Sequence, residues 1–345
     1  MGALSAFGCG ARAYAWSYQG LTVVSLENEV LRVSVLPEKG SDVVELRHKP
    51  SDVNVLLTVP RGWETLLRAP PSSPLTAFYA TYVGGWQDVL PSAGEASFRF
   101  RGAEWGTNYE TPLLPWRYRV SQAAGEALVE LVTELVRYPF RVEKVLRLRD
   151  GSDTLVVEER ITNLSDEDLE YMWLQHIVFA DSLVREGCRV DIAAGTVLTH
   201  GPPEFSELSF LKPGTLSEWP YSVSRSGERV DLSVVPKFSG RVYDMAYVMD
   251  LSEGRFAVSS PERGVSVEVE FPREVFRYVW LLYLNGGPCQ PPWHGRVRAL
   301  GVMPCTSYPA RGLLRAIENE TAVVLRGGAS VSAELRVRVS SGAET

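Results

Sequence analysis

The feature that most constrains the fold is a period of two in the distribution of apolar side chains. Residues 31–35 read LRVSV, residues 265–271 read VSVEVEF and residues 335–339 read LRVRV. Successive side chains of a strand point to opposite faces, so this alternation is typical of strands with one buried and one solvated face. Such strands suit antiparallel sheets. The sequence therefore predicts an all-β protein.

A turn composition joins two further strand-like runs. Residues 142–148 and 154–161 flank the segment DGSD at 150–153, and together they predict a β-hairpin. Helical periodicity is scarce and is suggested only by residues 123–136 and 206–211, of which the first fits a strand equally well. We therefore expect few helices.

The chain of 345 residues, with 29 Gly and 22 Pro, predicts many short strands in a pair of packed sheets or a closed barrel. No internal repeat of fixed period is visible, which disfavours a propeller or a solenoid. The proline-rich residues 70–74 predict a surface loop rather than a linker, because strand-like patterning resumes on both sides. We therefore expect one domain spanning residues 1–345.

The net charge and the cysteine content limit the classes of partner and cofactor that the chain is expected to bind. Thirty-five Lys and Arg against forty-two Asp and Glu give a net charge of −7, which argues against a nucleic-acid surface. No apolar run reaches the roughly 18–20 residues of a membrane helix, and the start resembles no signal peptide, so we expect a cytoplasmic protein without a membrane partner. The four cysteines form no C-x-x-C pair. We expect no metal and no cofactor, and we leave a homodimer open.

Aromatic and polar residues are mixed in a few segments that do not alternate cleanly. These segments are GGWQD at 84–88, residues 108–116, WLQH at 173–176 and residues 286–296. Sugars have apolar C–H faces that pack on aromatic rings, and hydroxyls that need carboxylate, amide or histidine partners. The mixture therefore favours a small-molecule carbohydrate as ligand, although any one of these tryptophans taken alone is more often core filling.

The catalytic motifs with well-defined spacing, such as G-x-S-x-G, H-E-x-x-H and the P-loop, are absent. His176 alone among the histidines lies in an aromatic, apolar context, and its ordinary pKa near 6.5 suits an acid or a base. The alternative is a hydrogen-bonded core histidine. His48 and His200 adjoin turn-forming residues, and we expect both to be solvated.

Five segments, taken in order along the chain, point to a known family. They are residues 31–46 with Pro37 and Gly40, GGWQDVLPSAG at 84–94, Glu110 with Pro115-Trp116, Thr162-Asn163 leading to WLQHIVF at 173–179, and WHGR at 293–296 leading to LGVMPCTS at 300–307. In these segments the chain resembles the aldose 1-epimerases, the galactose mutarotase-like proteins, over roughly residues 21–340.

The resemblance implies a galactose mutarotase-like β-supersandwich of large antiparallel sheets and, in the enzymes, interconversion of sugar anomers through ring opening. One group removes the proton of the anomeric hydroxyl while another protonates the ring oxygen. By resemblance His176 takes the acid role. The glutamate that acts as base in the family aligns with Met303 of this chain, which has no proton to exchange. A second histidine of the family aligns with Asn108.

Three hypotheses follow from the missing glutamate. Another carboxylate serves as base, with Glu110 and Asp88 as candidates; or the chain binds a sugar without turning it over; or the pocket runs a different acid/base reaction on a modified sugar. The residues expected to bind substrate lie in or near the matched segments, and they are Arg68, Trp86, Gln87, Asn108, Trp173, Trp293 and Met303.

Overall fold

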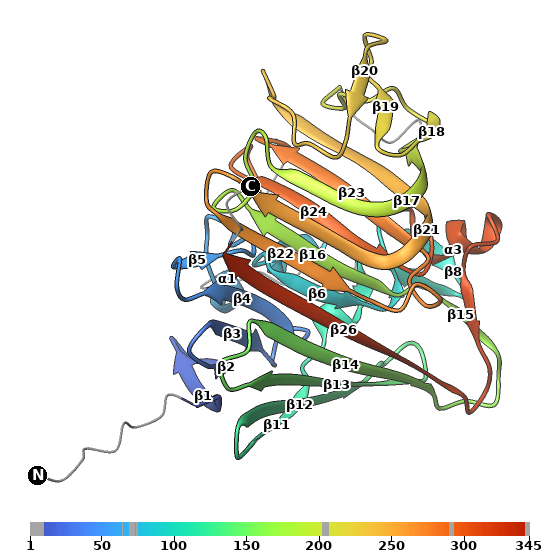
Figure 1. Ribbon diagram of the computed structural model, residues 1–345. Helices are drawn as coiled ribbons and strands as arrows, with labels where there is room; N and C mark the ends of the chain where they lie inside the picture. The colour runs from blue at the N-terminus through green and yellow to red at the C-terminus, as the bar shows by residue number, and fades with distance from the viewer. Residues whose placement is uncertain are drawn as a thin grey trace, which may run out of the picture.

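The computed structural model describes residues 10–63, 65–68, 73, 75–201, 207–289 and 293–341, without the side chains of residues 65, 68 and 97–99. Its helices are short: α1 (Thr65–Arg68), α2 (Ala77–Thr81), the 3-10 helix η1 (Thr111–Leu113) and α3 (Gly312–Glu318). None of the described helices combines the length and apolar character that crossing a bilayer requires. The rest of the regular structure is β-strand (Figure 1).

The strands of the first half are β1 (Arg12–Tyr18), β2 (Leu21–Glu27), β3 (Leu31–Leu36), β4 (Asp42–His48), β5 (Val53–Asn54), β6 (Trp86–Val89), β7 (Pro91–Ser92), β8 (Ser97–Phe100), β9 (Ala103–Trp105), β10 (Tyr109–Glu110), β11 (Arg117–Ala123), β12 (Glu126–Glu134), β13 (Phe140–Arg149) and β14 (Thr154–Asn163). Those of the second half are β15 (Leu169–Tyr171), β16 (Leu174–Ala180), β17 (Arg189–Thr199), β18 (Leu216–Glu218), β19 (Tyr221–Val223), β20 (Arg229–Asp231), β21 (Val242–Ser260), β22 (Val265–Glu270), β23 (Tyr278–Asn285), β24 (Arg298–Cys305), β25 (Val323–Leu325) and β26 (Ser330–Ser341).

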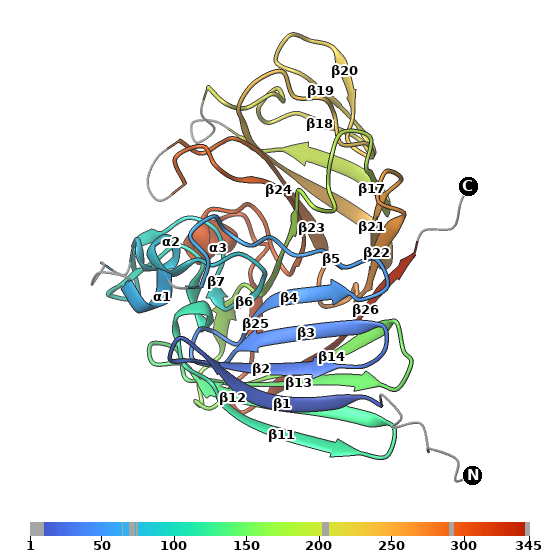
Figure 2. The ribbon, with the colours of Figure 1, turned by 90° about the vertical axis from the view of Figure 1, so that its left-hand side faces the viewer.

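One continuous antiparallel sheet holds most of these strands. Its order runs β11, β12, β13, β14, β26, β22, β21, β23, β24, β16, β6, β4, β3, β2, β1. The long strand β21 joins two parts of this sheet, because its residues Val242–Val248 pair with β23 of one part and its residues Arg255–Ser260 pair with β22 of the other. The sheet curls so that β1 and β2 at one end of it lie against β11 to β13 at the other end. These two ends therefore form facing layers (Figure 2).

Burial follows the alternation in the sequence. Along β12, β13 and β26, buried residues alternate with exposed or half-buried ones, so each strand has one core face. By contrast, all seven residues of β16 are buried. This strand lies between β6 and β24, with a cavity on one face and the sandwich interior on the other. β16 therefore occupies the middle of the molecule.

The structure confirms most of the expected elements. The three alternating segments form β3, β22 and part of β26, and the expected hairpin is the antiparallel pair of β13 and β14. Residues 123–136 contain strand β12, not a helix. The helical interpretation of residues 206–211 is wrong for 207–211, which form a turn and a bridge; residue 206 lies outside the described residues, as does most of the proline-rich stretch 70–74.

Candidate active site

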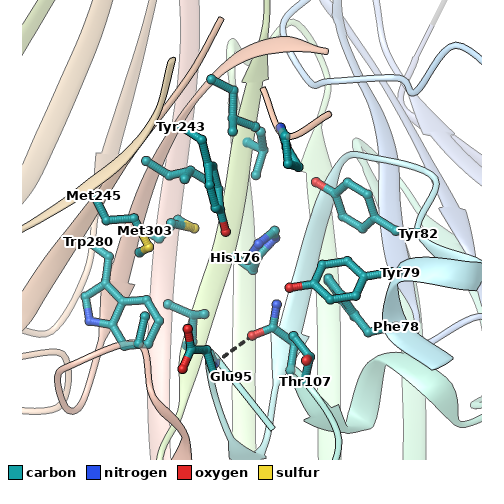
Figure 3. A pocket seen from close by; sticks show the side chains of 18 of the residues that line it. Phe78, Tyr79, Tyr82, Glu95, Thr107, His176, Tyr243, Met245, Trp280 and Met303 are labelled. Carbon is teal, nitrogen blue, oxygen red and sulfur yellow. Dashed lines mark hydrogen bonds between the residues drawn. The ribbon is translucent and has the colours of Figure 1, made fainter. Parts of the chain in front are cut away.

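A cavity of about 310 Å³ opens over one face of the central sheet, close to the lower end of the range of roughly 300–1,000 Å³ typical of small-molecule sites (Figure 3). Its floor consists of alternate residues from four neighbouring strands. They are Tyr243 and Met245 of β21, Trp280, Leu282 and Leu284 of β23, Met303 of β24, and Leu174, His176 and Val178 of β16. The period of two thus selects which residues of these strands face a ligand.

His176 lies on this floor, and a hydrogen bond at one of its ring nitrogens fixes which nitrogen carries the hydrogen. Its Nδ1 lies 2.9 Å from Oε1 of Gln87, its register partner on β6. The Gln87 amide nitrogen donates to the carbonyl oxygen of Gly84 (2.6 Å) and to Oδ2 of Asp42 (3.2 Å). Because that amide nitrogen faces two acceptors, Oε1 is the atom toward His176, so the imidazole carries its hydrogen on Nδ1. Nε2 is then the nitrogen that can accept a proton.

Burial lowers the pKa of His176 to about 4, because an imidazolium loses its hydration there. Aromatic rings cause much of this burial. Phe78 of α2 and Tyr82, the residue after it, meet the imidazole at centroid distances of 5.7 and 5.8 Å in edge geometry. Trp293, a predicted binding residue, packs on Tyr82 at a centroid distance of 5.3 Å and lines the cavity. The imidazole is therefore neutral near pH 7.

Glu95 lines one end of the cavity, and the sequence analysis did not single it out (Figure 3). The residue is exposed, and the partial desolvation of its carboxyl group raises the pKa of that group, while the positive charge of Arg311 opposes the rise. It is also the only carboxylate among the lining residues that the structure describes. Its position directly after the matched segment 84–94 was the available signal in the sequence.

A close backbone approach holds the loop that carries Glu95. Gly94 has φ of +90°, and a Cβ atom there would lie 2.2 Å from the carbonyl carbon of Ala310, so only glycine fits. The amide of Gly94 donates to Oδ1 of Asn108 (2.8 Å), and the amide of Asn108 donates to the Gly94 carbonyl (3.0 Å). Asn108 thus lines the cavity and positions the neighbour of Glu95.

Met303, a predicted binding residue, forms part of the floor. The pairs Leu174 with Cys305 and Val178 with Gly301 set the register of β16 and β24, and this register places Met303 opposite His176. A Cβ atom at Gly301 would come within 3.0 Å of the Met303 methyl group. The thioether therefore covers the floor beside the histidine, where no proton can be exchanged.

Two histidines differ from expectation. His200 is buried and lines the cavity; its Nδ1 pairs with the hydroxyl of Tyr247, whose oxygen also accepts from the amide of Ala310. Burial lowers the pKa of His200 to about 3. His48 is buried as well, with Nδ1 2.8 Å from Oγ of Ser51. The expectation that both are solvated is wrong, because the side chains turn inward although their neighbours in sequence form turns.

Asp88 does not line the cavity. It is wholly buried on the opposite face of β6, where Nζ of Lys144 lies 2.6 Å from Oδ2. Burial by itself would raise the pKa of Asp88, but Lys144 brings it below its ordinary value. Burial raises the pKa of the neighbouring Glu159 well above its ordinary value, and Glu159 accepts a hydrogen bond from Gln175 (2.7 Å). This cluster joins the layers of the sandwich and is separated from the cavity by the sheet.

Glu110 is also absent from the lining. Its carboxylate accepts hydrogen bonds from the amides of Val136 (3.0 Å) and Arg137 (3.2 Å), in the turn between β12 and β13. Burial raises the pKa of Glu110, and these amides oppose the rise. The carboxylate therefore fixes a turn, and its geometry gives it no access to a ligand held by His176.

The remaining predicted binding residues divide between cavity and core. Trp86 and Trp173 are buried in the interior, where Trp86 donates to Gln175 (2.7 Å) and Trp173 packs on Phe276. Neither lines the cavity. Gln87 acts on the site through His176, and Arg68 ends α1 with a side chain that lies outside the described residues. Within the described residues, no group of three His, Cys, Asp or Glu could hold a metal ion.

No protein-family model and no curated protein sequence matches the chain. Solved structures do. A candidate aldose 1-epimerase from Klebsiella pneumoniae superposes with a TM-score of 0.71 at 12% identity, covering 93% of this chain and 79% of its own. A galactose mutarotase-like protein from Clostridium acetobutylicum superposes with a TM-score of 0.63 at 12% identity, covering 96% and 99%. The chain therefore has the galactose mutarotase-like fold that the resemblance implied.

Proposed function

We propose that the chain binds an aldose in the cavity over β16 and interconverts its anomers by acid/base ring opening. The observation that carries the proposal is a neutral histidine whose tautomer is fixed, facing a cavity that a single described carboxylate also lines. The fold of candidate aldose 1-epimerases supports it. The reaction needs two groups that exchange protons with neighbouring oxygens of one sugar, and we assign these roles to His176 and Glu95, which line the same cavity.

The proton positions favour His176 as the first base. Nε2 accepts the proton of the anomeric hydroxyl, and the carboxyl group of Glu95, in the form of the protein in which it carries a proton, gives that proton to the ring oxygen. The C1–O5 bond breaks, the C1–O1 bond becomes an aldehyde, and rotation about C1–C2 exposes the other face. On closure the imidazolium returns its proton to O1 while the carboxylate takes the proton from O5. The roles are opposite to those that the resemblance implies, because burial disfavours a charged imidazole before substrate binds.

The test is polarimetry or one-dimensional NMR of freshly dissolved α-anomers of glucose, galactose and other aldoses. We expect wild type to accelerate equilibration, His176→Ala to lose about 10²- to 10⁴-fold and Glu95→Gln about 10²-fold. Glu143→Gln, an exposed glutamate of β13, is the matched control and leaves the rate unchanged. Full activity in Glu95→Gln would refute its role.

A second candidate function is sugar binding without catalysis. Met303 and the apolar side chains around it occupy the floor beside His176, where a second proton-exchanging group would otherwise stand. No acceleration for any aldose, together with a change in tryptophan fluorescence on sugar addition, would favour this function. Trp280 and Trp293 both line the cavity and would report the binding.

A further inference from the structure

A second concave site lies on the layer formed by β1 to β4, the blue strands of Figure 2. Its volume is about 460 Å³, within the range typical of small-molecule sites. The lining residues come from these strands and from residues 54–63, and no described residue lines both this site and the cavity over β16. Val24 and Val33, which point to the other face of β2 and β3, belong to the main core. We call this concave surface the outer-face site.

The sheet register places polar residues of the outer-face site in one row across four strands. Tyr14 of β1 pairs with Ser25 of β2, which pairs with Ser34 of β3. Ser34 pairs in turn with Glu45 of β4. Hydrogen bonds follow the row, because Oγ of Ser25 lies 3.2 Å from Oγ of Ser34, which donates to Oε2 of Glu45 (2.9 Å). The site therefore has a continuous polar floor that the fold holds in place.

Aromatic rings beside this floor are open to solvent. The side chains of Tyr14 and Trp16 are 38% and 39% exposed. Trp16 meets Tyr18 edge-on at a centroid distance of 6.3 Å, and Tyr18 meets Trp63 in the same way at 5.5 Å. Nε1 of Trp16 donates to Oγ of Ser25 (2.9 Å), which fixes the indole. Large apolar side chains gathered in an exposed place mark a binding surface, and fixed rings lose little freedom when a ligand packs on them.

The charged groups of the outer-face site are paired with one another. The carboxylate of Glu45 accepts hydrogen bonds from Nε and Nη2 of Arg32 (3.0 and 2.7 Å) and from Nε of Arg47 (2.8 Å). Nη1 of Arg47 also donates to Oδ1 of Asp52 (2.6 Å). Burial by itself would raise the pKa of Glu45, but the two arginines bring it below its ordinary value. Two guanidinium and two carboxylate groups thus balance, which favours an uncharged ligand over a cation or an anion.

The two arginines keep donors for such a ligand. Their side chains are 40% and 27% exposed, and Nη1 of Arg32 and Nη2 of Arg47 form no hydrogen bond within the described part of the chain. A sugar ring has C–H faces that pack on aromatic rings and hydroxyls that accept from such donors. We propose that the outer-face site binds a neutral saccharide, which packs one face on Trp16 and turns hydroxyls toward Arg32 and Arg47. This binding does not depend on the function proposed above.

The test is NMR of the indole N–H groups in protein labelled with nitrogen-15 tryptophan, assigned with single Trp→Phe variants. The probes are cellotetraose, maltotetraose and β-1,4-galactotetraose at about 10 mM, which detects dissociation constants in the millimolar range. We expect at least one of them to shift the signals of Trp16 and Trp63. Trp280 and Trp293 line the other cavity and report binding there separately. Shifts confined to these two, or no shift at all, would overturn the inference.

Variants of one exposed ring test where the saccharide packs. With the Trp63 signal as readout, we expect Trp16→Ala to weaken binding about tenfold and Trp16→Phe, which keeps a ring, to weaken it less than about threefold. Tyr118→Ala removes an equally exposed ring of β11 outside the site and should leave binding unchanged. An equal effect of Trp16→Ala and Tyr118→Ala would overturn the inference. Tighter binding of choline or of tetragalacturonate than of any neutral probe would overturn the assignment of an uncharged ligand.

Discussion

The two faces of β16 show opposite ways of placing titratable groups in one buried strand. On the cavity face, His176 is surrounded by apolar and aromatic side chains and has no charged neighbour on the floor. On the other face, Gln175 belongs to a charged cluster in which Lys144 and Asp88 form an ion pair of 2.6 Å. Charges that are paired inside the sandwich hold its layers together, whereas His176, which faces the cavity, is neutral and able to accept a proton.

The largest effect is expected from breaking the charged face. Lys144→Met removes the cation that faces Asp88 and Glu159 and leaves two buried carboxyl groups without it. We expect a loss of about 3–5 kcal/mol in the free energy of unfolding, measured by urea denaturation. The double variant Lys144→Met with Asp88→Asn should recover part of it. A loss below about 1 kcal/mol would show that the ion pair is not what joins the layers.

The low pKa of His176 on the cavity face should make the free energy of unfolding depend on pH. The pKa of His176 is about 4 in the folded protein and about 6.5 in an unfolded chain, so the unfolded chain binds more protons between these values. Stability therefore falls as the pH falls from about 6.5 to about 4, by about 3 kcal/mol for this group. Denaturation of His176→Leu across this range should lack that part of the dependence. Parallel curves for wild type and variant would contradict the depressed pKa.

Replacing one amide side chain on each face of the sheet, in separate variants, tests whether the two faces act independently. Gln87→Met removes the acceptor that fixes the hydrogen on Nδ1 of His176, and we expect about a tenfold fall in kcat with little change in KM. Gln175→Met is the matched control, because this amide lies on the opposite face and donates to Glu159. It should lower stability and leave the rate unchanged. A similar fall in rate for both variants would mean that the two faces are not separate.

The smallest effect is expected at an exposed ion pair next to the buried one. Arg141, on the same strand as Lys144, lies 2.7 Å from Glu134, and both side chains are about half exposed. Water and salt screen such a pair, so Arg141→Ala should cost less than about 1 kcal/mol and even less at high ionic strength. A cost comparable to that of Lys144→Met would show that burial is not the source of the difference.

The fold could be predicted from the sequence because its strands alternate. The pattern in residues 31–35, 265–271 and 335–339 depends only on local burial, and the structure reproduces it in β3, β22 and β26. Cavity and core could not be told apart in the same way. Trp86 and Asp88 face the interior while Gln87 faces His176, because successive residues of β6 point to opposite sides of the sheet.

Glu95 illustrates a second reason why the sequence alone does not locate the cavity residues. Its place at the cavity depends on the approach of Gly94 to Ala310, two residues more than two hundred positions apart. His200 likewise reaches the cavity through the fold, where it pairs with the hydroxyl of Tyr247, whose oxygen in turn accepts from the amide of Ala310. Contacts at such separation leave no periodic signal in the sequence, so neither residue could be placed before the structure was known.

The most direct test of the account is the state of His176 in solution. Nitrogen-15 NMR of histidine-labelled protein, assigned with His176→Asn, distinguishes the two neutral tautomers from the imidazolium. The account predicts a neutral ring at pH 7 with its hydrogen on Nδ1, and a single titration near pH 4. A ring protonated on both nitrogens at pH 7, or a neutral ring with its hydrogen on Nε2, would contradict it.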